Sequence, residues 1–164
     1  MNAKQPVIAG LISVLLLTAG CSSSTEADAV DSRSFASDLA SAVAAQNAAA
    51  FGGQTDDQVQ FEKAFTENLS ASAADAYADQ STYLAAIASN TSVLSTTVSV
   101  EHVSSASGTD GHTTITADLL ISRALRDGPA WEEVIPYVSS IDNVTGIVDS
   151  LVVQDDAWHL AHND

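Results

Sequence analysis

The sequence has one cysteine and five basic residues in 164, and each shortage excludes a class of protein. One cysteine cannot form an internal disulfide framework or a metal site built from several thiolates. Five Lys and Arg against 21 Asp and Glu give a formal net charge of −16, so we expect no nucleic-acid partner. The G-x-S-x-G nucleophile motif and glycine-rich phosphate loops are also missing. The sequence therefore predicts a protein that is not an enzyme and carries no cofactor.

The longest apolar run, residues 7–17, follows the positive charge of Lys4 at the N-terminus. A membrane span needs roughly 20 apolar residues, so this shorter run is typical of a signal peptide. The next residues, Thr18-Ala19-Gly20-Cys21, resemble the lipobox of bacterial lipoproteins, except that this family usually has Leu where Thr18 stands. The resemblance implies cleavage between Gly20 and Cys21 and acylation of Cys21, with palmitate among the fatty acids. The alternative is an ordinary signal peptide, with Cys21 left as a free thiol or removed.

Residues 1–20 would then be the signal peptide and residues 21–32 a polar tether of Ser, Thr, Ala and acids. A flexible tether of this length would hold a domain about 15–20 Å from the membrane. With 4 basic and 21 acidic side chains, the mature chain would carry a charge of −17, which anionic lipid head groups repel. We therefore expect the acyl chains on Cys21 to bind the membrane lipid alone. The predicted location is the extracytoplasmic face of the bacterial cell membrane.

Residues 33–164 are predicted to form one α+β domain, with helices first and strands second. Apolar residues at helical spacing predict three helices, with Ser34 as the first N-cap and Gly52-Gly53 as the first stop. Their ranges are about 34–51, 56–69 and 73–88. Alternating apolar and polar residues predict an antiparallel sheet of about four strands, at 93–103, 113–122, 145–154 and 157–162. Residues 123–143 interrupt the alternation and are interpreted as an irregular insert.

Helices followed by a meander that ends in Trp158-His159-Leu160 resemble the nuclear-transport-factor-2-like, cystatin-like superfamily. In that superfamily the helices pack into the concave side of a curved sheet and form a cone. Within it, the low-molecular-weight secreted antigen family of mycobacteria and relatives has short motifs similar to Ala78-Asp79, Val98-Ser99-Val100, Thr116-Ala117-Asp118 and Trp158-His159-Leu160. The resemblance implies a cystatin-like cone and an envelope protein of bacteria, in particular of actinobacteria. It implies no established enzymatic activity, and the insert at 123–143 departs from the family pattern.

An extracytoplasmic enzyme is the alternative function, because enzymes of the wider superfamily place an Asp–His or Asp–Tyr pair inside the cone. Burial there would shift the pKa of the carboxyl group toward catalytic use. Asp149 and Asp118 are the candidate acids, and His102, on the apolar face of the first strand, is the candidate partner. Alternation places Asp118 toward water, however, and Asp149 could lie at a bulge where the alternation changes.

No metal site is predicted from the histidines. His159 and His162 are three residues apart, and on a strand that spacing directs them to opposite faces. A site would require His102 or His112 to converge on one of them, which the sequence does not indicate. We expect Trp158, on the same predicted strand, to be a core residue because it shares alternation with Leu160.

Recognition is expected in the insert, which concentrates Trp131, Ile135 and Tyr137 beside acidic residues and carries Pro129 and Pro136. Aromatic residues on a proline-stiffened loop suit a surface that binds a partner or ligand at low entropic cost. The alternative is that these residues cap the open end of the cone and only pack. The predicted function is thus that of a non-catalytic, lipid-anchored envelope lipoprotein, which binds a cell-envelope protein or a small apolar ligand.

Overall fold

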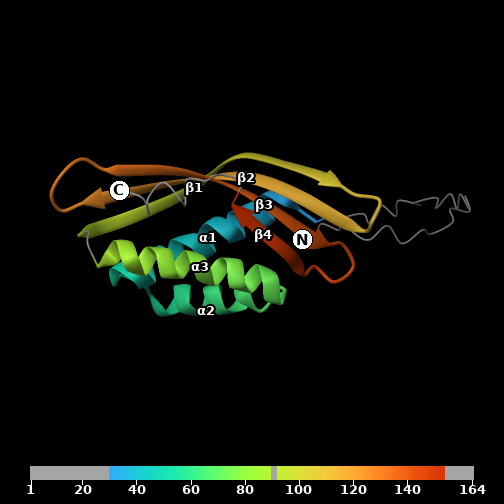
Figure 1. Cartoon of the computed structure of the whole chain (residues 1–164), viewed down its shortest axis with the longest axis horizontal. Helices are drawn as coiled ribbons and strands as arrows, with labels where there is room; N and C mark the ends of the chain where they lie inside the picture. Colours follow the sequence, from blue (N-terminus) through green and yellow to red (C-terminus); the bar gives the residue numbers. More distant parts are fainter. Residues whose placement is uncertain (1–29, 90–91, 154–164) are drawn as a thin grey trace, which may run out of the picture.

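The computed structural model describes residues 30–89 and 92–153, which form three helices followed by four strands (Figure 1). The helices are α1 (Ser32–Phe51), α2 (Asp56–Thr66) and α3 (Ala71–Ala88). The strands are β1 (Val93–Ser107), β2 (His112–Leu125), β3 (Trp131–Asp142) and β4 (Val148–Val153). The helices precede the strands and pack on an open antiparallel sheet, so the predicted α+β fold is confirmed.

Local chemistry sets the ends of the helices. Asp31 caps α1, because its carboxylate accepts hydrogen bonds from the backbone N–H groups of Arg33 and Ser34. The predicted cap at Ser34 is therefore wrong, and the helix begins earlier. Gly52 ends α1 with a φ of 81°, a left-handed conformation that glycine adopts without steric cost. Thr55 opens α2 with the capping box that its sequence predicts.

The sheet is a meander in the order β1-β2-β3-β4, and each neighbouring pair is antiparallel. Helix α1 packs under β1 and β2, α3 packs under β4, and α2 packs against α1 (Figure 1). Alternate residues of β2 and β3 point toward the helices and are buried, as strand geometry requires. The space under the sheet is filled by apolar side chains, among them Leu39, Val43, Phe65, Tyr77, Ile115, Leu119, Ile121, Ile135 and Ile141.

The predicted insert at 123–143 is wrong, because most of it belongs to the sheet. Residues 131–142 form β3, which pairs with β2 over its whole length. Pro136 obscures the strand in the sequence, since proline lacks an N–H and is rare inside a sheet. Pro136 immediately precedes Tyr137, which pairs with Val153, the last described residue of β4. Among the described residues only β2 flanks Pro136, through Asp118.

The last two predicted strands have different outcomes. The strand expected at 145–154 corresponds to β4, which begins at Val148 after a turn. The strand expected at 157–162, with Trp158, lies outside the described residues. The described sheet has four strands because it includes β3, which the sequence pattern does not predict, while the strand expected at 157–162 lies outside the described residues.

Candidate functional site

The three residues predicted to form a recognition surface do not share one. Ile135 is 2% exposed and Tyr137 is 3% exposed, and both point from β3 into the core. The Tyr137 hydroxyl donates a hydrogen bond to Oε1 of Gln80 at 2.8 Å, and burial raises the pKa of the tyrosine. Trp131 is half-buried and lies against the Arg123 guanidinium, with 4.7 Å to the ring centroid. The predicted binding surface is therefore wrong, because a central strand turns these residues inward, where they pack.

A buried ion pair lies beside Trp131. Arg123 is 0% exposed, and its Nη1 donates to Oε2 of Glu133 at 2.8 Å. Its Nε donates to Oδ1 of Asn47 on α1 at 3.0 Å. The Tyr83 hydroxyl donates to the other Glu133 oxygen, and burial followed by the Glu133 charge raises the pKa of Tyr83 to about 12. We call Arg123, Glu133, Asn47, Tyr83 and Trp131 the buried cluster; it connects helices to sheet.

The candidate acid–base pair forms outside the core. His102 Nδ1 lies 2.9 Å from Oδ2 of Asp118, so two of the candidate residues do meet. The His102 side chain is 78% exposed, however, and a bulge between Glu101 and Ser104 places it off the apolar face. Its φ of 50° marks the same irregularity. The predicted placement of His102 on the apolar face is therefore wrong, and Val103 takes the inward position instead.

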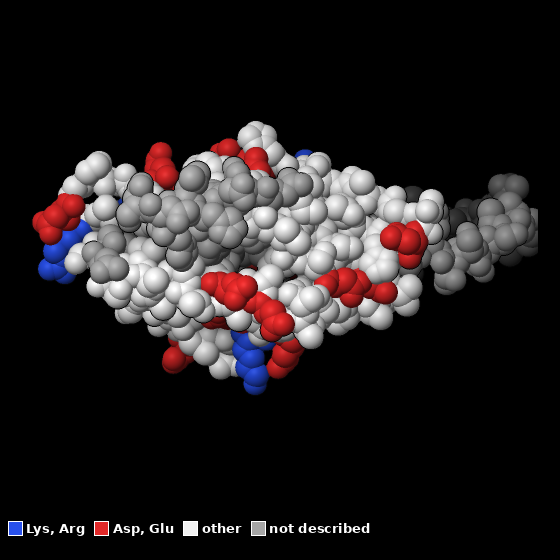
Figure 2. Space-filling model, in the orientation of Figure 1, with Lys and Arg blue, Asp and Glu red and all other residues white. Residues whose placement is uncertain are grey.

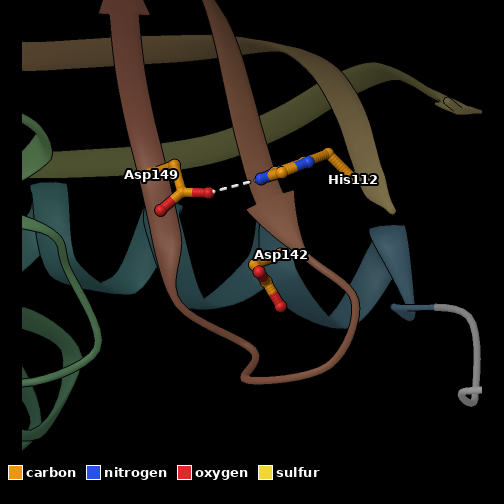
Figure 3. Close-up of side chains that lie close together, drawn as sticks. All are labelled: His112, Asp142 and Asp149. Carbon is orange, nitrogen blue, oxygen red and sulfur yellow. Dashed lines mark hydrogen bonds and ion pairs between the residues drawn. The ribbon is translucent and has the colours of Figure 1, made fainter. Parts of the chain in front are cut away.

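Asp149 has a different partner, His112, which begins β2 (Figure 3). His112 Nε2 lies 2.7 Å from Oδ2 of Asp149, and this hydrogen bond is the main cause that raises the pKa of His112. Asp142, the last residue of β3, is paired with His112 across the two strands. One oxygen each from Asp142 and Asp149 and one ring nitrogen of His112 lie within 4.8 Å of one another. We call these three residues the rim cluster.

Asp142 is held by the turn that follows it. Its Oδ1 accepts hydrogen bonds from the backbone N–H groups of Val144 and Thr145, each at 2.8 Å. These two bonds are the main cause that lowers the pKa of Asp142, so its carboxyl group stays ionised. Sequence reasoning misses the rim cluster because Asp142 and Asp149 are far from His112 along the chain and meet it only through strand pairing. The one sequence signal for the rim cluster is the possible bulge at Asp149, and the structure has a register shift at this point between β3 and β4.

A groove of about 610 Å³ lies between parts of α1 and β1. Its α1 wall carries small residues, Ser37, Ala40, Ser41 and Ala44, and its β1 wall carries Val98 and Val100. Arg33, Glu101 and His102 also line it. Elsewhere, Figure 2 shows acidic side chains scattered over the visible face with few basic ones, in keeping with the net charge of −16.

Comparison with protein-family models, with curated proteins and with solved structures found no match. The resemblance to the secreted antigen family therefore stays a prediction. Gly20, Cys21, Trp158, His159 and His162 lie outside the described residues. Within residues 30–89 and 92–153, no helix combines the length and apolar character that crossing a membrane requires.

Proposed function

We propose that this chain is a non-catalytic binding protein of the bacterial envelope, anchored by lipid on Cys21. The observation that carries the proposal is the filled interior beneath the sheet. An enzyme of the alternative class needs an acid–base pair that faces an enclosed cavity. Among the described residues, the interior is packed with apolar side chains, and its carboxylate, Glu133, is paired with Arg123. The candidate pair His102 and Asp118 is not enclosed, since the two side chains are 78% and 33% exposed.

The groove between α1 and β1 is the binding surface that we favour for this function. It is recessed, and its walls mix apolar side chains with a few polar ones, as sites for small ligands usually do. Arg33 lines it and lies in the first turn of α1, next to the predicted tether, whose last residues Asp31 and Ser32 cap and begin that helix. A ligand in the groove would therefore be held near the membrane, at the end of the domain where the anchor enters.

Anchoring is tested by labelling cells with palmitate and separating their membranes. We expect the parent chain to take up label and to stay with membranes, and Cys21→Ala to remain unlabelled and to be either released or uncleaved. A mature, membrane-bound Cys21→Ala protein would contradict the anchor.

Binding is tested by native mass spectrometry of the protein extracted from membranes in mild detergent. Ala44→Trp fills the groove, and Ala49→Trp on the exposed side of α1 is the matched control. We expect a bound mass to be present in the parent and in Ala49→Trp and to be lost in Ala44→Trp. An equal bound mass in all three proteins would exclude the groove, and no bound mass in any would count against a small ligand.

A further inference from the structure

The geometry points to a binding site for a divalent transition metal, of which Zn²⁺ is the type, formed by the rim cluster of His112, Asp142 and Asp149. The site is independent of the proposed function, since it rests on the arrangement of these three side chains alone. Each comes from a different strand, and the three side chains lie close together (Figure 3). They lie at the end of the sheet where the turns before β2 and after β3 meet, since the Asn143 N–H donates to the Gly111 carbonyl.

The strand register gives the three side chains a common position. His112 and Asp142 are direct partners in the β2–β3 ladder, so their side chains project from the same face of the sheet. In the β3–β4 ladder, Ser140 pairs with Ser150 but Ile141 pairs with Val148, which leaves Asp149 as the extra residue of a bulge. A bulge redirects one side chain, and here it brings Oδ2 of Asp149 to 2.7 Å from His112 Nε2.

The imidazole of His112 is oriented in the way that metal-binding histidines usually are. Its Nδ1 lies 3.2 Å from the backbone carbonyl oxygen of Asp110. A carbonyl oxygen only accepts, so Nδ1 carries a proton. An ionised carboxylate also only accepts, so without a metal Nε2 carries a second proton and donates it to Asp149. A hydrogen bond from the distal ring nitrogen to a carbonyl fixes the tautomer of a metal ligand and raises its basicity. This contact lies outside the cluster and directs Nε2 into it.

The charges of the cluster match a divalent cation. Within residues 30–89 and 92–153, no Lys or Arg forms an ion pair with Asp142 or Asp149. With a protonated His112 the cluster has a charge of −1, from two carboxylates and one imidazolium. With a neutral His112 it has a charge of −2, which a divalent metal balances. Binding would give the Nε2 lone pair to the metal and release the shared proton to solvent.

Donor type and spacing select the class of metal. One imidazole nitrogen and two carboxylate oxygens suit Zn²⁺, whereas Ca²⁺ takes about six to eight oxygen ligands. Tetrahedral ligands at about 2.0–2.2 Å from Zn²⁺ are roughly 3.3–3.6 Å apart. The three donor atoms now lie within 4.8 Å of one another, so small side-chain rotations would be needed to reach these distances. The side chains of His112 and Asp149 are 33% and 43% exposed and have room for such rotations.

The His102–Asp118 pair supplies a matched control. It is also a histidine hydrogen-bonded to one carboxylate, at 2.9 Å, on the same sheet. Among the described residues no second carboxylate joins it to make a three-ligand group. If any exposed His–Asp pair on this acidic protein bound zinc, the two pairs would behave alike.

The test is calorimetric titration of ZnCl₂ into the full chain carrying Cys21→Ser, in mild detergent, so that no thiol binds the metal. Variants of this parent are Asp149→Asn, Asp142→Asn and the control Asp118→Asn. In Asp142→Asn the new amide oxygen would still accept the two backbone hydrogen bonds, so the turn is kept while the charge is lost. Thermal unfolding in EDTA checks that each variant folds. His159 and His162 are unchanged throughout, so they cancel in the comparison.

We expect one zinc ion per chain to be bound by the parent and equally by Asp118→Asn. Changes to outer-shell partners of metal ligands cost roughly 10–100-fold in affinity, so loss of a ligand in Asp149→Asn or Asp142→Asn should cost at least about tenfold. Absence of binding to the parent would overturn the proposal and leave an ion pair between His112 and Asp149. Equal binding by all variants would overturn it too, as would a loss confined to Asp149→Asn, because Asp142 would then be no ligand.

Discussion

Strand β2 carries a charged cluster near each of its ends, and the two clusters differ in what surrounds them. Toward the C-terminal end, Arg123 points inward and is completely enclosed, with Glu133 and Asn47 as partners. At the first residue of the strand, His112 projects from the opposite face and is half-exposed beside Asp149. The two positions, 112 and 123, differ in parity, so strand alternation alone directs them to opposite sides of the sheet.

The difference shows how the surroundings of a charge decide its role. Removing an arginine and a carboxylate from water is costly, and here the two charges, their hydrogen bonds and the Trp131 ring beside Arg123 offset this cost. Arg123 and Glu133 therefore cannot release each other to bind a ligand. The rim cluster keeps contact with solvent, and among the described residues no Lys or Arg forms an ion pair with its carboxylates. Such groups can bind a cation at little structural cost.

The largest effect should follow from breaking the buried cluster. Arg123→Met leaves Glu133 as an uncompensated, mostly buried charge, and we expect the free energy of unfolding to fall by about 3–5 kcal/mol. Equilibrium denaturation by urea measures this loss. The double variant Arg123→Met, Glu133→Leu removes both charges and should recover most of it. A single variant as stable as the parent would show that the ion pair has no structural role.

The next largest effect should be a loss of stability at alkaline pH, caused by the buried tyrosines. All three tyrosines of the chain, Tyr77, Tyr83 and Tyr137, have a raised pKa in the fold, mainly because of burial. The folded state therefore holds these protons more tightly than the unfolded state, whose tyrosines ionise near pH 10. Stability is retained below about pH 10 and falls as the pH rises above it.

Near-ultraviolet absorbance of tyrosinate and far-ultraviolet circular dichroism, followed together, measure this effect. We expect the tyrosinate signal to rise only with the loss of helical signal, well above about pH 10. Ionisation of all three tyrosines near this pH in a protein that keeps its circular dichroism would place them at the surface and contradict the described core.

Much of the fold could be predicted because its signals are local. The capping box at Thr55, the stop at Gly52 and the alternation of β2 depend on residues that are close in sequence. Strand β3 escapes prediction because Pro136 and the paired acids before it suggest a loop, and only pairing with β2 overrides them. Arg123 escapes it for a related reason. It continues the inward alternation of Ile121, but a charged side chain at an inward position indicates the end of a strand unless its partners are known.

The rim cluster could not be predicted, because three long-range events create it. The hairpin register sets Asp142 opposite His112, the bulge turns Asp149, and the Asp110 carbonyl orients the imidazole. Each depends on which residues pair across strands, and a shift of one residue would reverse the faces. The wrong prediction for His102 has the same cause. A bulge that the sequence does not reveal directs its side chain to solvent rather than to the expected apolar face.

The most direct test of the central claim, that charge is structural at one end of β2 and available for binding at the other, is the zinc-induced thermal shift of two single variants. Glu133→Gln and Asp149→Asn each remove one carboxylate charge, in the Cys21→Ser background with EDTA or with ZnCl₂. We predict that Glu133→Gln lowers the melting temperature in EDTA and keeps the rise produced by zinc. Asp149→Asn should change the melting temperature in EDTA little, since exposed ion pairs contribute about 0–1 kcal/mol, and should lose the rise. The reverse pattern, or a zinc response equal in both variants, would contradict the account.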